Sequence, residues 1–188
     1  SENLRVVNNT GSLDLTIQDS ASDQAVFGHN DLNGNDSVQL NTSGSASLTL
    51  LVDGADSTGA PGDLLQTIAA GSSSQNHDIT DSNFDNSHAN SVGGGVTISG
   101  GGAGSDITVD YQVIDSNFTG AVGTALNATF TPQAGDIRGL ISGNVVGVND
   151  GLSTGVGSLT GNGISVGLDK IAGSGDATYT ATIENNQV

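Results

Sequence analysis

Carboxylates are the side chains of this sequence that could carry out acid–base chemistry. Of its 20 acidic residues, only Glu2 and Glu184 are Glu, and the others are Asp. Asp81 and Asp115 occupy the same place in two similar hexapeptides, so they would form a carboxylate pair if these segments stacked on each other. Enzymes that cleave polysaccharides use paired carboxylates as general acid and base.

Such enzymes also need basic side chains to hold an anionic substrate, and this sequence has only three, far apart. They are Arg5, Arg138 and Lys170. A further pair, Asp106 and Asp110, has the spacing of residues on one face of a strand. We interpret all four Asp residues as corner or surface positions, and we expect no catalytic activity and no organic cofactor.

Calcium binding is the second kind of chemistry that the acidic residues indicate. Segment 30–36 gathers carboxylate and amide oxygens, the ligands that Ca²⁺ prefers, around a glycine turn. The candidate ligands are Asp31, Asn33, Asn35 and Asp36. The segment lacks the final Glu of an EF-hand, so the sequence leaves a calcium site and a plain turn open. Segment 101–106 matches the calcium-roll motif Gly-Gly-x-Gly-x-Asp once, and a roll needs tandem copies, so we predict a glycine turn there.

Other metal and redox chemistry has little basis in the sequence. The chain has no Cys, which excludes disulfides and thiolate metal sites. His29, His77 and His88 lack the short spacing of paired metal ligands. We expect each His to be solvated or hydrogen-bonded within the fold.

Net charge and hydropathy limit the partners. The formal net charge of −17 at pH 7 would repel nucleic acid and anionic membrane surfaces, so we expect neither as a partner. No stretch of about 18 apolar residues occurs, and we expect no membrane insertion. No signal peptide precedes Ser1, so we expect a mature or excised chain.

An irregular internal repeat organises the sequence. Its clearest copies are the hexapeptides 79–84 and 113–118, which share the pattern Ile-x-Asp-Ser-Asn-Phe or a close variant of it. Aligning the weaker copies gives one apolar anchor in each. The anchors are Ile17, Val52, Ile79, Val113, Ile141 and Ile183. Unequal spacings of 27 to 42 residues between anchors exclude a solenoid of fixed period but allow coils with variable loops.

The residues before each anchor alternate between apolar and polar. Segments 106–113 and 177–183 alternate strictly, which predicts strands with one buried face. The copy before Ile79 is poor because Gln75 and His77 would point inward, so we predict a bulge or slipped register there. A second short apolar run follows each anchor, with turns rich in Gly, Asn and Ser on either side. Asn144 and Asn186 occupy matching corner positions and predict a ladder of stacked side chains.

Together these patterns predict an all-β fold, a right-handed parallel β-helix (β-solenoid) of about five to six irregular coils with variable loops. Residues 37–188 would form its coils. Residues 1–36 match less well and would supply strands and a turn, as a first coil or an end contact. An antiparallel β-sandwich also has short alternating strands and remains the alternative fold.

The sequence also resembles large bacterial right-handed β-helix surface proteins, including autotransporter-like and repeat-rich adhesins. The resemblance lies in segments 163–166, 173–178 and 183–186, and in 123–127 with 141–144. It implies secretion, surface display and stacking, and it supplies no catalytic residues. It covers roughly residues 37–188.

These observations favour a non-catalytic extracellular structural protein, a rod or filament subunit of a bacterial surface assembly. No amphipathic capping helix is evident, so we expect the open ends to be held by neighbours. End-to-end self-association and continuation into a longer chain both satisfy this expectation. The alternative is an adhesin module that binds a glycan or host surface through loops near 54–63, 85–95 and 147–162. An enzyme acting on polysaccharide is the least favoured class.

Overall fold

The chain folds into a parallel β-solenoid with three sheets. The computed structural model describes residues 2–20, 25–28, 35–87, 91–147, 157–171 and 175–188. Within these ranges it has strands and turns but no helix. Sheets A and B hold six strands each and sheet C holds five, which compares with the five to six coils predicted.

Each coil contributes one strand to each sheet, except that no sheet C strand follows β17. Sheet A contains β1 (Leu4–Asn8), β4 (Val38–Thr42), β7 (Leu65–Ala69), β10 (Val96–Gly101), β13 (Leu126–Thr131) and β16 (Ile164–Leu168). Sheet B contains β2 (Ser12–Gln18), β5 (Ser47–Asp53), β8 (Ser74–Thr80), β11 (Asp106–Ile114), β14 (Ala134–Ser142) and β17 (Ala177–Glu184). Sheet C contains β3 (Val26–Gly28), β6 (Asp56–Thr58), β9 (Asn83–Asp85), β12 (Asn117–Thr119) and β15 (Val145–Val146).

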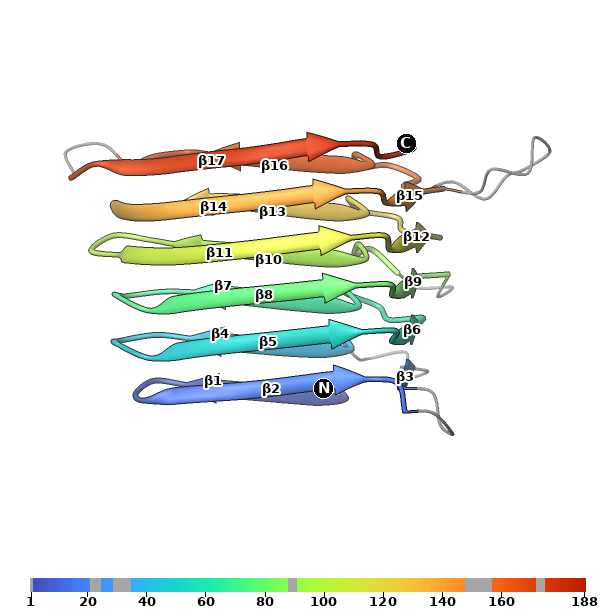
Figure 1. Cartoon of the computed structure of the whole chain (residues 1–188), viewed down its shortest axis with the longest axis horizontal. Coiled ribbons are helices and arrows are strands. Elements are labelled where there is room, and N and C mark those ends of the chain that lie inside the picture. Colours follow the sequence, from blue (N-terminus) through green and yellow to red (C-terminus); the bar gives the residue numbers. More distant parts are fainter. Residues whose placement is uncertain (1, 21–24, 29–34, 88–90, 148–156, 172–174) are drawn as a thin grey trace.

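The coils wind in the right-handed sense. In Figure 1 the strands of sheet B run to the right in front, those of sheet A return to the left behind, and successive coils rise from the N-terminus to the C-terminus. Every strand pair is parallel, which excludes the antiparallel sandwich. The short segments of sheet C, which the sequence left as turns and loops, form the third wall.

The six predicted anchors form one continuous row inside the solenoid. Neighbouring strands of sheet B pair Ile17 with Val52, Val52 with Ile79, Ile79 with Val113, Val113 with Ile141 and Ile141 with Ile183. Residues two and four positions earlier also stack in the expected order. Because a shift of one residue would turn every apolar side chain outward, the buried core fixes this register.

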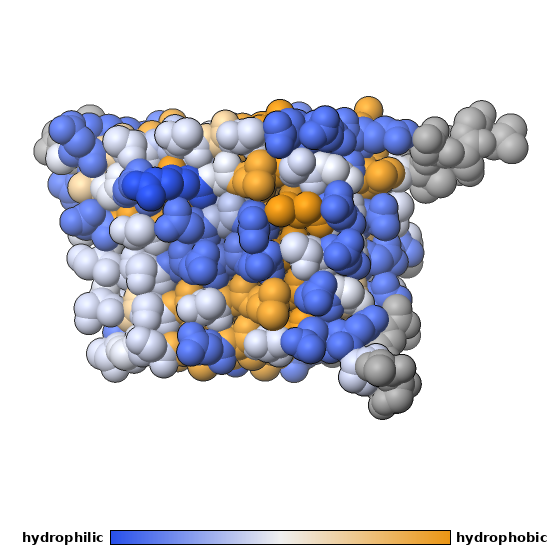
Figure 2. Space-filling view, in the orientation of Figure 1, coloured by the Kyte–Doolittle hydropathy of each residue, from blue (hydrophilic) through white to orange (hydrophobic). Residues whose placement is uncertain are grey.

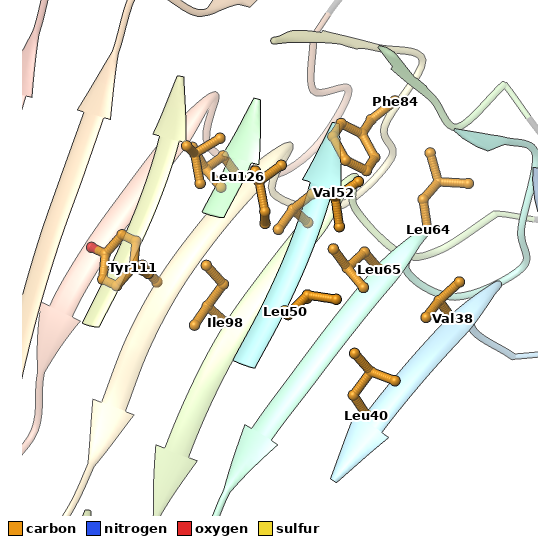
Figure 3. Close-up of a cluster of buried hydrophobic side chains, with 14 of the residues drawn as sticks. Val38, Leu40, Leu50, Val52, Leu64, Leu65, Phe84, Ile98, Tyr111 and Leu126 are labelled. Carbon is orange, nitrogen blue, oxygen red and sulfur yellow. The ribbon is translucent and has the colours of Figure 1, made fainter. Parts of the chain in front are cut away.

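The interior is narrow and filled by branched apolar side chains. Figure 3 shows Leu40, Leu50, Ile98 and Leu126 directed into the space between the sheets, and all four are fully buried. Outward-facing residues are mixed, and Figure 2 shows the sheet B face as largely hydrophilic with apolar patches. Burial of each branched side chain contributes roughly 1.5–3 kcal/mol, which is how a chain this poor in aromatics can hold a fold together.

The predicted bulge near Gln75 and His77 is wrong. β8 keeps an unbroken register with β5 and β11, and both side chains point inward, Gln75 2% and His77 1% exposed. They are tolerated because they bond to each other and to buried hydroxyls. Gln75 Oε1 lies 2.9 Å from His77 Nε2, and Gln75 Nε2 donates to Thr42 Oγ1 at 2.8 Å. A hydrogen-bonded polar pair can therefore replace two apolar side chains without a change of register.

Aromatic residues also fill part of the interior. Phe84 and Phe118 stack in sheet C with ring centroids 5.2 Å apart. Tyr111 leans over Gly139 of the next coil, where a Cβ would collide with the Tyr111 ring. Its hydroxyl bonds to that of Tyr179, so one large side chain occupies the space that a glycine leaves.

Candidate functional site

The two ends of the stack are the candidate functional site. β16 and β17 lie at one edge of sheets A and B, and β1 and β2 lie at the opposite edge. We call these surfaces the C-terminal face and the N-terminal face. An edge strand presents N–H and C=O groups that can pair with a further strand.

Apolar rows that are buried in the middle of the stack are exposed at the C-terminal face. In the anchor row, Ile79, Val113 and Ile141 are fully buried, whereas Ile183 is 46% exposed. Val166 and Val188 are 37% and 75% exposed. A hollow of about 480 Å³ lies beside them, with Gly163, Ile164, Ile183 and Val188 in its lining.

The N-terminal face carries the opposite ends of the same rows. Its apolar side chains are partly buried and pack against the core on one side. They are Leu4, Val6, Leu13, Leu15 and Phe27. The anchor row itself ends here in Ile17, which is only 7% exposed, so the apolar surface open at this face belongs to the partly buried side chains.

A hydrogen-bonded row runs along the corner between sheets B and C. Asn144 Nδ2 donates to Asn186 Oδ1 at 2.9 Å, which confirms the predicted ladder. The row continues with serines: Ser116 N donates to Asn144 Oδ1 at 3.0 Å, and Ser82 N donates to Ser116 Oγ at 3.2 Å. Each side chain thus accepts the backbone N–H of the coil before it, and this satisfies a donor that the corner would otherwise bury.

Asp81 and Asp115 occupy equivalent corner positions on adjacent coils, as predicted. Both have left-handed backbone angles, φ 48° and 50°, which Asp tolerates better than most residues. Gly143 takes the same corner position one coil later, with φ 71°. Both Asp side chains are exposed, and each occupies the left-handed position of its turn.

The outer face of sheet B carries a shallow groove of about 450 Å³. Asp78, Asp110, Arg138 and Thr180 belong to its lining. Arg138 forms an ion pair with Asp136, and the Thr178 hydroxyl and then the Arg138 charge lower the pKa of Asp136. Asp106 and Asp110 share this outer face, as expected, since they alternate with the buried Ile107 and Val109.

Of the four predicted calcium ligands, Asp31 and Asn33 lie outside the described residues. Asp36 is 2% exposed and accepts hydrogen bonds from Asp63 N at 2.9 Å and from Gln39 Nε2 at 3.0 Å. The Asn35 amide donates to the same carboxylate. Burial raises the pKa of Asp36, and the nearby Asp63 and Glu2 charges add to this shift. In the described ranges, no three His, Cys, Asp or Glu side chains converge as a metal site.

Of the three histidines, only His77 lies within the described residues. His29 and His88 lie outside the described residues. His77 is buried in the polar pair with Gln75, and burial lowers its pKa to about 3. The neutral imidazole of His77 is therefore hydrogen-bonded within the core, which is one of the two environments expected from the sequence.

The comparisons with known proteins give no relative to set beside this geometry. No family model, no curated protein and no solved structure matches the chain. Among the described residues, no helix is long and apolar enough to span a membrane.

Proposed function

We propose that the chain is a non-catalytic structural β-helix, a rod or filament subunit of a bacterial surface assembly outside the cell. The observation that carries this proposal is the anchor row, which is fully buried at Ile141 and 46% exposed at Ile183 one coil later. An apolar row with an open edge strand is a surface built for a further layer of the stack.

The sides of the stack support the same role. They carry small polar and acidic side chains, and an acidic surface keeps rods apart laterally while leaving the ends free to bind. An extracellular location agrees with the absence of Cys and with the resemblance to bacterial β-helix surface proteins. Protease treatment of intact source cells, followed by detection of this chain, tests that location: resistance in intact cells and cleavage after lysis would contradict it.

Light scattering after size exclusion, combined with electron microscopy, tests the structural role. We expect the particle mass to rise with protein concentration and the particles to lengthen along one axis. The variant Ile183→Lys places a charge on the C-terminal face and should abolish this growth. Val92→Lys is the matched control, since Val92 is 79% exposed and lies outside both faces. A monomer that persists at millimolar concentration would overturn the proposal.

Glycan binding is a second candidate function, favoured by the groove on sheet B. Arg138, Asp110 and Thr180 offer donors and acceptors for sugar hydroxyls. This groove lies on a sheet face, whereas the sequence pointed to loops. A glycan array, followed by calorimetry with any hit, tests it: Arg138→Ala should weaken binding, and an array without hits would eliminate this candidate.

A further inference from the structure

We propose that the C-terminal face binds the N-terminal face of a second copy of this chain, in a parallel register that continues the strands and the apolar rows of the stack. The inference rests on the proposed structural role and specifies its partner. Three features of the two faces lead to it.

Strand direction is the first. β1 and β16 are opposite edges of sheet A, and β2 and β17 are opposite edges of sheet B. A copy translated along the stack would add its β1 to β16 and its β2 to β17 as parallel strands, like every pair within the chain. Two copies related by a twofold axis would bring antiparallel edges together and interrupt the rows.

The apolar rows are the second feature. The strand pairings of sheet B place Gln18 and Glu184 in one row, so Ile17 of the second copy would align with Ile183. By the same alignment in sheet A, Leu4 would cover Ile164 and Val6 would cover Val166.

Sheet C adds a side chain of suitable size for the hollow beside these strands. Phe27 belongs to the row that passes through Phe84, Phe118 and Val146. Val188 continues this row, because Val145 bridges to Gln187. Phe27 of the second copy would therefore lie over Val188, at the hollow of about 480 Å³.

The corner row is the exception to this continuity. Each coil from the third onward provides a side-chain oxygen for the backbone N–H of the coil before it, and Asn186 is the last member. In the first coil Ala25 takes the corner position, because Val26 pairs with Asp56 and Asp56 N donates to Ala25 O as Asn83 N donates to Ala55 O. Ala25 has no side-chain oxygen, so the row of side-chain hydrogen bonds would not continue across the junction.

Charge is the third feature. In this register Arg5 would face Ser165 and Asp14 would face Thr180, while Gln18 would face Glu184. None of these pairs carries like charges, although the chain as a whole has a net charge of −17. The register therefore avoids direct repulsion at the junction.

Cysteine cross-linking tests the register directly, because the native chain has no Cys. Arg5→Cys and Ser165→Cys are made in separate chains, mixed and oxidised. Adjacent parallel strands place facing Cα atoms about 4.8 Å apart, within the range for a disulfide. We expect a mixed dimer as the main product. Thr180→Cys, on the same face but in sheet B, is the matched partner that should not cross-link to Arg5→Cys.

Preferential formation of homodimers by either variant, or equal yields with Thr180→Cys, would overturn the register. Filaments that form without the mixed cross-link would overturn the register and leave the structural role standing. Absence of both assembly and cross-link would overturn both.

Discussion

Asn144 and Asn186 lie one above the other at the corner between sheets B and C, joined by a hydrogen bond of 2.9 Å. Asn144 is fully buried. Its Oδ1 accepts a hydrogen bond from Ser116 N at 3.0 Å, and its Nδ2 also donates to Val113 O at 2.8 Å. One amide thus connects three successive coils.

Replacing Asn144 by Ala should lower the free energy of unfolding by about 2–4 kcal/mol, because two buried backbone groups lose their partner. Asn144→Ser should cost less, since Ser82 and Ser116 show that a hydroxyl can accept the same kind of N–H bond. Urea denaturation measures both, with the exposed Asn117→Ala as control. Equal losses for Asn144→Ala and Asn117→Ala would contradict the importance of the ladder.

Acid should destabilise the chain through His77. Its pKa is about 3 in the folded chain and about 6.5 in the unfolded one, so the unfolded state binds the proton first as the pH falls. The contribution of neutral His77 to the free energy of unfolding is complete above pH 6.5. It is lost as the pH falls from 6.5 to 3, which costs up to about 5 kcal/mol.

A double variant isolates this contribution. Gln75→Leu with His77→Leu copies Leu48 and Leu50, which occupy the same positions in β5. Thermal unfolding across pH 3–7 should show a weaker acid dependence for the double variant than for the native chain. Parallel curves for the two proteins would exclude His77 as the source.

Asp36 should make the folded chain less stable as the pH rises, which is opposite to the effect of His77. Burial raises its folded pKa above 3.8, so the folded state holds the proton more tightly than the unfolded one. The cost of ionised Asp36 is absent at low pH and develops as the pH rises through the folded pKa. Asp36→Asn should therefore gain stability relative to the native chain as the pH rises from 3 to 7. A stability difference that does not change with pH would contradict the shift.

Gly139→Ala should destabilise the chain by about 1–3 kcal/mol, because the added methyl group meets the Tyr111 ring. Tyr111→Leu should relieve much of this cost, so the double variant should be more stable than the sum of the two single changes allows. Guanidinium denaturation of all four proteins gives the coupling energy. Strict additivity would show that Tyr111 and Gly139 do not share this space.

The sequence predicted the structure best where one residue type recurs at the same position of successive coils. The anchors, the alternation before them and the Asn corner all follow from period-two burial and from the need to satisfy corner N–H groups. Sheet C was missed because its strands have only two or three residues, too few to show alternation. The register at Gln75 was mispredicted because hydrogen bonds between residues distant in sequence, such as Gln75 and Thr42, leave no local pattern.

The candidate site was predictable only in outline. The sequence indicated that the ends lack a capping helix, but the exposure of Ile183 depends on its being the last of six stacked residues. The filling of the space over Gly139 by Tyr111 also depends on the fold, because the two residues are 28 positions apart in the chain and become neighbours through the pairing of β11 with β14.

The connections from sheet C to sheet A differ in length, from residues 59–64 between β6 and β7 to residues 147–163 between β15 and β16. Paired strands on both sides keep their register regardless of this difference. Residues can therefore be gained or lost along one edge of the molecule without disturbing its interior. Evolution, or a protein engineer, can vary that edge freely while the periodic scaffold beneath it stays the same.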